Sequence, residues 1–306
     1  MQRLAEGILR GDLRALARGL SIVENRLPGG VDLLAAVHPA RRKALRVGVT
    51  GPPGVGKSTL VDRLAAELRR GGETVGVLAV DPSSPFSGGA VLGDRVRMQR
   101  HHRDDGVFIR SMASRGQLGG LAPAVDDGLA LLEAAGLQSV VIETAGVGQS
   151  EVDIVQLAGT VAVVLAPSMG DDIQASKAGI MEIADVFVVN KSDQPGADEL
   201  ERQILAMISL IPEGQPRPLI LRTCALSGKG VAELLAAVRS APARQPEALY
   251  WRRFLQERLG REVEDWLASV SGIDLEGAAE QIAAGALNPY VFVRETAQSL
   301  RTRWLP

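Results

Sequence analysis

The sequence predicts an α/β fold in which a mostly parallel sheet is covered by helices on both faces. Short apolar runs rich in valine and isoleucine recur through the middle of the chain, as is typical of strands buried on both faces. The segments between most of these runs are long enough to form crossover helices, which parallel neighbours require. A glycine-rich stretch, "GPPGVGKST", also joins the first run to a helical pattern.

Helical extensions are expected on either side of this sheet. Residues 1–43 carry leucine, isoleucine and alanine at helical spacing, with a break near Pro28. Residues 244–306 return to an amphipathic pattern, whose apolar anchors are Trp251, Phe254, Leu255 and Trp266. Between them, strands are expected at 45–50, 75–80, 139–143, 161–166, 185–190 and 218–223. We therefore predict a helical extension (1–43), an α/β domain (44–243) and a helical segment (244–306) that mediates homodimerisation.

Composition indicates a cytoplasmic protein. The net charge of −2 provides no global positive field, so neither nucleic acid nor a membrane is expected as a partner. Hydrophobic residues make up 46% of the chain, which is ample for a core, yet no segment approaches the length of a membrane-spanning helix. The single cysteine, Cys224, excludes an internal disulfide framework and suits a reducing compartment.

The glycine-rich stretch matches the phosphate-binding pattern Gly-x-x-x-x-Gly-Lys-Ser in its required context, after a strand and at the start of a helix. Backbone N–H groups of such a turn converge on phosphate oxygens. Lys57 is expected to reach the β- and γ-phosphates, and Ser58 to bind Mg²⁺. The predicted phosphate-binding residues are Gly51, Pro52, Pro53, Gly54, Val55, Gly56, Lys57, Ser58 and Thr59.

A second motif, "NKSD", selects guanine. Asp193 can accept hydrogen bonds from the N1–H and exocyclic amine of guanine, which adenine does not offer. Asn190 is expected to tie this loop to the phosphate loop, and the Lys191 stem to lie over the purine. The later stretch Cys224-Ala225-Leu226 is expected to form the last guanine-contacting loop, although a small-residue turn is an alternative. GTP and GDP are therefore the predicted ligands.

Acidic residues follow two of the predicted strands. Asp81 and Glu143 each lie at a strand end, where open α/β sheets hold ligands, and Asp94 follows in "LGDRVRM". With Ser58 these acids exceed what one Mg²⁺ ion needs, because Mg²⁺ usually keeps several waters. We assign Ser58 to direct contact and Asp81, Asp94 and Glu143 to direct or water-mediated contact. A helix-capping or solvated role is the alternative for each acid taken alone.

The ordered set of motifs resembles one family of GTPases. It comprises "GPPGVGKSTL", "VLAVDPSSPFSGG", "LGDRVRM", "FIRSMASRGQLGG", "VIETAGVGQSE", "GDDIQASKAGIMEIADVFVVNKSD" and "CALSGKG". The chain is similar over nearly its whole length to the methylmalonyl-CoA mutase-associated GTPase chaperones, relatives of which carry the older label of arginine/ornithine-transport kinase. The resemblance implies a P-loop GTPase that gates the loading of adenosylcobalamin into an acyl-CoA mutase, protects that enzyme and promotes removal of damaged cofactor.

The stretch "VIETAGVGQSE" implies slow hydrolysis. Many GTPases have Asp-x-x-Gly here, followed by a glutamine that positions water, whereas this chain has Glu143, Gly146 and then Val147. A GTPase without a positioning group or an arginine finger is slow until a partner completes the site. Gly146 is expected to face the γ-phosphate, and Lys57, Asp94, Glu143 and Lys177 are the predicted catalytic residues.

The resemblance also implies a third switch that relays the nucleotide state to the mutase. Its predicted residues are Asp171, Asp172, Gln174 and Lys177. The alternative is an exposed helix start. Three stretches depart from the family's usual pattern: Ala145, "GDDIQASK" and "RSMASRG". Because they fall in partner-facing segments, they leave GTP binding intact and leave open which mutase is the partner.

Two other functions are alternatives. A GTPase that inserts metal into another enzyme would need a cluster of cysteine and histidine ligands, and this chain has one cysteine and three histidines. We interpret His101, His102, Asp104 and Asp105 as a solvated loop instead. A kinase linked to amino-acid transport would need a base beside an acceptor pocket and would transfer phosphate rather than release it. The basic run "RVRMQRHHR" lacks the interleaved aromatic residues of a nucleic-acid site.

Overall fold

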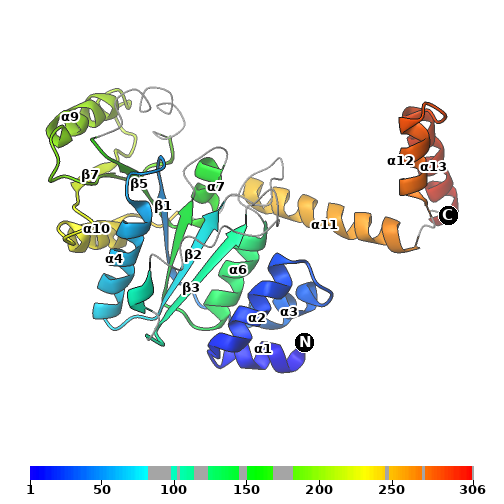
Figure 1. Cartoon of the computed structure of the whole chain (residues 1–306), viewed down its shortest axis with the longest axis horizontal. Coiled ribbons are helices and arrows are strands. Elements are labelled where there is room, and N and C mark those ends of the chain that lie inside the picture. The colour runs from blue at the N-terminus through cyan, green and yellow to red at the C-terminus, as the bar shows by residue number, and fades with distance from the viewer. Residues whose placement is uncertain are drawn as a thin grey trace. The chain divides into compact units, whose positions relative to one another are not determined.

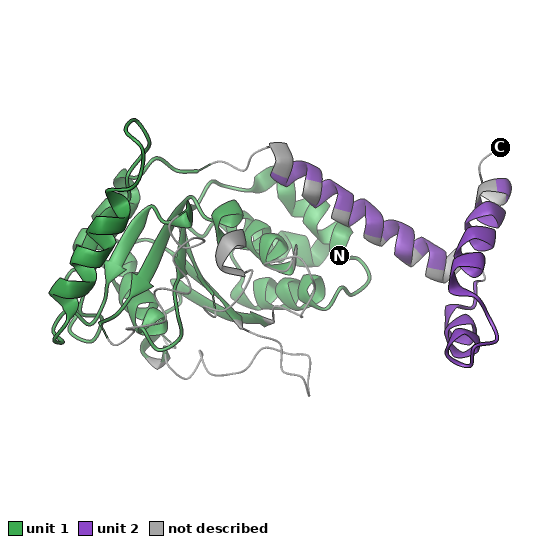
Figure 2. Cartoon of the chain, turned by 90° about the horizontal axis from the view of Figure 1, so that it is seen from above, with its two compact units in different colours: residues 1–245 green, residues 246–306 purple. Residues whose placement is uncertain are grey.

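The chain forms two compact units, residues 1–245 and 246–306 (Figure 2). The computed structural model describes residues 1–81, 98–101, 104–113, 123–144, 150–167, 182–244, 248–270 and 273–304. The larger unit holds the sheet and the N-terminal helices, and the smaller unit is helical.

A seven-stranded sheet with strand order β3-β2-β4-β1-β5-β6-β7 forms the centre of the larger unit. All six strand pairs are parallel, which confirms the predicted fold class. The strands are β1 (Leu45–Thr50), β2 (Val75–Asp81), β3 (Val107–Ala113), β4 (Ser139–Thr144), β5 (Thr160–Leu165), β6 (Val186–Val189) and β7 (Leu219–Arg222). The sequence analysis did not predict β3, which is an edge strand with half-buried residues and therefore lacks a continuous apolar run.

Helices cover both faces of this sheet (Figure 1). They are α4 (Lys57–Arg70), α6 (Pro123–Ala134), α7 (Ser150–Leu157), α9 (Ala197–Ile208) and α10 (Val231–Ser240). From β1 the chain moves through α4 toward the β3 edge, whereas α6 and α7 carry it toward the β7 edge. Because parallel crossovers are right-handed, α4 lies on one face and α6 and α7 lie on the other. Helix α10 packs beside α4.

The N-terminal helices α1 (Gln2–Leu9), α2 (Leu13–Glu24) and α3 (Gly30–Val37) pack on the outer side of α6 (Figure 1). Their approach is close at Gly19, where an added Cβ would lie 2.8 Å from the Ile8 side chain and 3.4 Å from those of Leu33 and Leu131. Two short 3-10 helices, η1 (His38–Ala40) and η2 (Gln99–His101), complete the described elements of this unit.

The smaller unit consists of α11 (Ala248–Val270), α12 (Leu275–Ala283) and α13 (Pro289–Trp304). The predicted apolar anchors lie on α11, where Tyr250, Trp251 and Phe254 form an aromatic cluster with ring centroids 5.2–6.3 Å apart. The exposed fractions of Leu255, Leu259 and Val263 are 55%, 64% and 53%. This row of exposed apolar residues, four apart, follows one side of the helix.

Candidate functional site

The phosphate loop connects β1 to α4, and its shape requires glycine. Gly51 has a φ of 136°, and an added Cβ there would lie 2.1 Å from the carbonyl oxygen of Val164 on β5. Gly54 and Gly56 also adopt positive φ, and at Gly56 a Cβ would lie 2.7 Å from the Asn190 amide nitrogen. The loop therefore lies directly over the end of the sheet, and α4 begins immediately after it. A glycine-rich loop before a helix N-terminus is an arrangement that favours binding of an anion.

Lys57 is buried at the first position of α4, with its amine folded back over this loop. Its Nζ donates to the carbonyl oxygens of Gly51 at 2.7 Å and Pro52 at 2.9 Å. A buried ammonium needs such acceptors, and they hold its positive charge beside the loop's backbone. A phosphate chain in the loop would exchange these neutral acceptors for charged ones, which are stronger partners.

Ser58 and Glu143 meet at the carboxyl ends of β1 and β4. The Ser58 hydroxyl donates to Glu143 Oε1 at 2.7 Å, and Glu143 is a buried residue that is only 5% exposed. Beside them, the Thr144 hydroxyl donates to the Thr50 hydroxyl at 2.7 Å. The backbone of Asp81 ends the neighbouring strand β2, which pairs with β4. The structure therefore brings three of the predicted metal-site positions to adjacent strand ends.

Asn190 links the phosphate loop to the loops predicted to hold the base. Its amide nitrogen donates to the Val55 carbonyl oxygen at 2.8 Å. Its Oδ1 accepts from the Thr223 hydroxyl at 3.0 Å and from the Ala225 N–H at 3.1 Å. The buried Asn190 side chain thus satisfies three groups from two segments of the chain, and its contact with the phosphate loop is the expected one.

The remaining residues of the predicted base site lie around this amide. Lys191 has a φ of 54° and donates from Nζ to the Gly54 carbonyl oxygen at 2.9 Å, while Asp193 is exposed. Cys224 and Ala225 are buried and Leu226 is exposed. Arg63 on α4, which the sequence analysis did not single out, donates from Nε to the Ala225 carbonyl oxygen at 3.0 Å and from Nη2 to that of Leu226.

The family model described as Methylmalonyl Co-A mutase-associated GTPase MeaB matches residues 16–264. The chain belongs to the MeaB family. It is 44% identical over 285 residues to a Pyrococcus horikoshii protein named as a GTPase, covering 92% of this chain and 90% of the relative. It is 33% identical over 328 residues to the Escherichia coli GTPase ArgK, covering 98% of both chains. The crystal structure titled LAO/AO transport system kinase superimposes with a TM-score of 0.69 at 25% identity, over 98% of this chain and 97% of that one.

Membership of the MeaB family confirms the resemblance drawn from the motifs and makes the chain a P-loop GTPase, which binds GTP and GDP. Several predicted residues of this GTPase lie outside the described residues: Asp94, Gly146, Val147, Asp171, Asp172, Gln174 and Lys177. For Asp81, only the backbone position at the end of β2 is described. In the described ranges no helix combines the length and apolar character needed to cross a membrane.

The interpretation of His101 and Asp104 as a solvated loop is wrong. His101 is buried on η2, with Nε2 lying 3.2 Å from the buried Asp62 carboxylate of α4, and Arg100 Nε lies 3.0 Å from the same carboxylate. Asp104 is half-buried and pairs with Arg69 at 2.8 Å. Sequence inspection missed these pairs because their partners on α4 lie more than thirty residues away in the chain. Within the described part of the chain, no group of three or more His, Cys, Asp or Glu residues could hold a metal ion.

These contacts shift the pKa values of His101 and Asp104, among others. The hydrogen bond to Asp62 raises the pKa of His101 above its ordinary value, although burial and the charge of Arg100 act in the opposite direction. The hydrogen bond from Arg69 lowers the pKa of Asp104, with help from the Gly106 N–H. The segment that follows the predicted metal ligand Asp94 is thus anchored to α4 by charged groups.

Proposed function

We propose that this GTPase is a chaperone for an adenosylcobalamin-dependent acyl-CoA mutase, either methylmalonyl-CoA mutase or a close relative. It would gate loading of the cofactor and promote protection and reactivation of the enzyme. The observation that carries this proposal is the family match over residues 16–264, because the description of that family names association with methylmalonyl-CoA mutase. The specific partner is part of the proposal, and a different acyl-CoA mutase would be distinguished by co-purification with nucleotide present.

We further propose that intrinsic hydrolysis is slow and is accelerated by the mutase. Val147 follows the switch glycine, so a hydrocarbon side chain stands where many GTPases place a glutamine. A missing group that positions water slows hydrolysis by several orders of magnitude relative to an activated GTPase. The proposed catalytic residues are Lys57, Asp94, Glu143 and Lys177, of which Lys57 would stabilise charge on the β- and γ-phosphates.

Mg²⁺ is the proposed cofactor. The donor set at the strand ends consists of oxygen atoms, which Mg²⁺ prefers, and the Ser58 and Glu143 oxygens already lie 2.7 Å apart. Ser58 would bind the ion directly, while Glu143, Asp81 and Asp94 would act directly or through water. A bound ion would supply charge neutralisation for the phosphates. In that state a lone pair of the Ser58 hydroxyl oxygen would bind the metal, since the hydroxyl uses only its proton in the bond to Glu143.

We propose the rest of the predicted GTP site on the same geometry. The phosphate loop from Gly51 to Thr59 and Gly146 would hold the phosphates. Asn190, Lys191 and Asp193 would hold the base together with Cys224, Ala225 and Leu226. The free and buried Cys224 suits the reducing cytoplasm, in which we place the protein.

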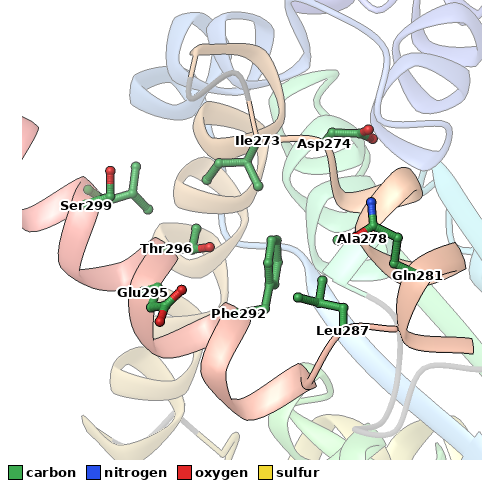
Figure 3. A pocket seen from close by; sticks show the side chains of 10 residues that line it. Ile273, Asp274, Ala278, Gln281, Leu287, Phe292, Glu295, Thr296 and Ser299 are labelled. Carbon is green, nitrogen blue, oxygen red and sulfur yellow. The ribbon is translucent and has the colours of Figure 1, made fainter. Parts of the chain in front are cut away.

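The smaller unit is the proposed homodimerisation segment, within the proposed division into 1–43, 44–243 and 244–306. Besides the exposed row on α11, it has a hollow of about 580 Å³ along α12 and α13. Leu287 and Phe292 both face this hollow, which is also lined by exposed polar residues such as Gln281 and Glu295 (Figure 3). Exposed apolar surface of this kind favours burial against another protein surface, and a second copy is the occupant we propose.

Single-turnover GTP hydrolysis tests the proposed coupling. Wild type and Lys177→Ala are compared with and without saturating adenosylcobalamin-dependent methylmalonyl-CoA mutase from the same cell. We expect the mutase to accelerate wild type and Lys177→Ala to lose most of this acceleration. The GTP affinity and slow intrinsic hydrolysis of the variant should stay close to those of wild type, because Lys177 is proposed to complete the site only when the mutase docks. Lys43→Ala, at an exposed position before β1, is the control and should behave as wild type.

Full acceleration of the Lys177→Ala variant would remove the 168–181 segment from the coupling mechanism. Absence of any effect of the mutase on wild type would contradict the chaperone proposal for that enzyme. The kinase alternative is tested in the same reaction with γ-labelled GTP, because a kinase leaves label on an acceptor, whereas a GTPase releases it as free phosphate.

A further inference from the structure

We infer that Arg63 is a positioning residue for guanine recognition, because it fixes the backbone of the Ala225–Leu226 loop from the phosphate-loop helix. The inference rests on the proposed guanine site. Arg63 lies on α4, six residues after Lys57 of the phosphate-binding motif. Its side chain is half-buried. The two carbonyl oxygens that it binds belong to residues more than 160 positions later in the chain.

The loop holds part of its own backbone without help from α4. The Cys224 N–H donates to the Lys229 carbonyl oxygen at 3.0 Å, and the Cys224 carbonyl oxygen accepts from the Gly228 N–H at 2.8 Å. Gly230, with a φ of 79°, fixes the exit, because an added Cβ would lie 2.0 Å from the Arg222 carbonyl oxygen. Contacts within the loop therefore fix the backbone where the loop begins and ends, but they do not fix its tip.

The tip at Ala225 and Leu226 is held by side chains from elsewhere. Asn190 accepts the Ala225 N–H, and Arg63 donates to both tip carbonyl oxygens. A guanidinium presents its donors in a rigid plane, so one side chain can bind two adjacent carbonyl oxygens at once. In the described part of the chain, these are the only hydrogen bonds to the tip carbonyls from outside the loop.

Because the peptide bond is planar, the hydrogen bonds from Arg63 to these carbonyl oxygens also fix the direction of the N–H groups that follow them. In a trans peptide the carbonyl of one residue and the N–H of the next point in opposite directions. When Arg63 holds the Ala225 carbonyl toward α4, the Leu226 N–H points away from α4. Among the residues that the structure describes, none accepts a hydrogen bond from that N–H. It is thus free to donate to the O6 atom of a guanine base, the acceptor on the same Watson–Crick edge whose donors Asp193 would bind.

Two recognition elements of the base then become separable. Asp193 would read the N1–H and the exocyclic amine, and the tip would read O6. Loss of Arg63 should loosen the tip and weaken the O6 contact, while leaving the Asp193 contact in place. One neutral hydrogen bond corresponds to a change of about threefold to tenfold in affinity.

The experiment measures affinities for GDP, 6-thio-GDP and inosine diphosphate with the full-length chain. Sulfur at position 6 is a weaker acceptor than oxygen, and inosine lacks the exocyclic amine. In wild type we expect GDP to bind more tightly than both analogues. In Arg63→Met, which retains the apolar stem, the preference for GDP over 6-thio-GDP should fall about threefold to tenfold, and GDP should dissociate faster by a similar factor. The preference for GDP over inosine diphosphate should change by less than about twofold, and the loss in GTP turnover should appear in KM rather than in kcat.

Two further variants keep the test sharp. Arg63→Lys retains the charge but not the planar fork, so it should restore part of the lost preference. Arg70→Met, at the exposed end of the same helix where Arg70 pairs with Glu67, should match wild type throughout. Equal weakening of all three diphosphates by Arg63→Met, with unchanged ratios, would reduce Arg63 to a packing residue and overturn the inference, as would wild-type affinities in that variant. A wild-type chain with no preference for GDP over ADP would instead contradict the proposed guanine site itself.

Discussion

At the scale of single residues, one amide carries much of the connection between the two halves of the nucleotide site. Asn190 bonds the phosphate loop through Val55 and the base loops through Thr223 and Ala225. Its removal would leave three groups in these two segments without this partner, at a cost of about 1–3 kcal/mol for each that stays buried and unsatisfied. Asp193 follows three residues later on an exposed turn, where it is accessible to a base.

The base specificity proposed for Asp193 gives the first prediction. Asp193→Asn should lose about 2–4 kcal/mol of GTP binding, because a charged hydrogen-bond acceptor is replaced by an amide. The same variant should gain affinity for xanthosine triphosphate, since the amide can donate to the additional carbonyl of xanthine. Titration of both nucleotides checks this. Unchanged GTP affinity without xanthosine triphosphate binding would remove Asp193 from the base site.

Substitutions of Ser58 and Lys57 should differ in how their loss of GTP affinity depends on Mg²⁺. Ser58→Ala should weaken GTP binding about tenfold or more in Mg²⁺ and have little effect in EDTA, because only the metal contact is lost. Lys57→Ala should weaken binding under both conditions, since its contact is with the phosphates. Calorimetry with and without Mg²⁺ makes the comparison. Equal losses for the two variants in EDTA would show that Ser58 is not a metal ligand.

At the scale of elements, the sequence predicts what is local or buried. Six strands are predictable because they are continuous apolar runs. The phosphate loop is predictable because all of its motif lies within nine consecutive residues. Strand β3 was missed because an edge strand keeps polar residues such as Arg110 and Ser111. Arg63 and the His101–Asp62 pair were missed because each depends on a contact between distant segments, and no local pattern marks such a contact.

The contact between η2 and α4 should make stability depend on pH. The pKa of His101 is raised, so the folded state binds its proton more tightly than the unfolded chain does. The stabilisation is therefore fully present below the unfolded pKa of about 6.5 and is lost as the pH rises through the higher folded value. His101→Gln should lower the free energy of unfolding by about 1–2 kcal/mol at pH 6 and by less at pH 8.

Denaturant unfolding of wild type and His101→Gln between pH 5.5 and pH 8.5 measures this difference. The groups facing His101 are Asp62 and Arg100, with Asp104 nearby, and only the histidine titrates ordinarily in that window. His38→Gln is the control, because His38 is exposed on η1. A constant difference between wild type and His101→Gln across the window would show that the protonated ion pair does not contribute.

At the scale of the whole molecule, the two units have different kinds of surface. The larger unit closes its core around the sheet, whereas the smaller unit leaves large apolar side chains exposed on α11 and α13, including Leu259 and Tyr290. Its three helices bury few large apolar residues among themselves in the described ranges. A surface of this type is usually covered in the working assembly.

A charge placed on the α11 row should therefore disrupt the proposed homodimer. Leu255→Glu combined with Leu259→Glu should convert the dimer to a monomer, because burying either carboxylate in an apolar interface is unfavourable. Light scattering coupled to gel filtration measures the mass of the particle. Glu264→Lys, at an exposed position on the opposite side of the same helix, should leave the mass unchanged. A variant that remains dimeric would place the association surface elsewhere.

The packing of the N-terminal helices on α6 determines when these helices can complete their core during synthesis. Helices α1 to α3 are synthesised first, yet the buried side chains of Leu16, Leu20 and Leu33 belong to a core completed by α6. The ribosome must therefore translate β1, α4, β2 and β3 before the partner helix emerges, an interval on the order of ten seconds at about 5–20 residues per second. Throughout that interval the nascent chain carries an unfinished apolar surface at its leading end, so this extension is where a newly made chain would be open to chaperones or to wrong partners.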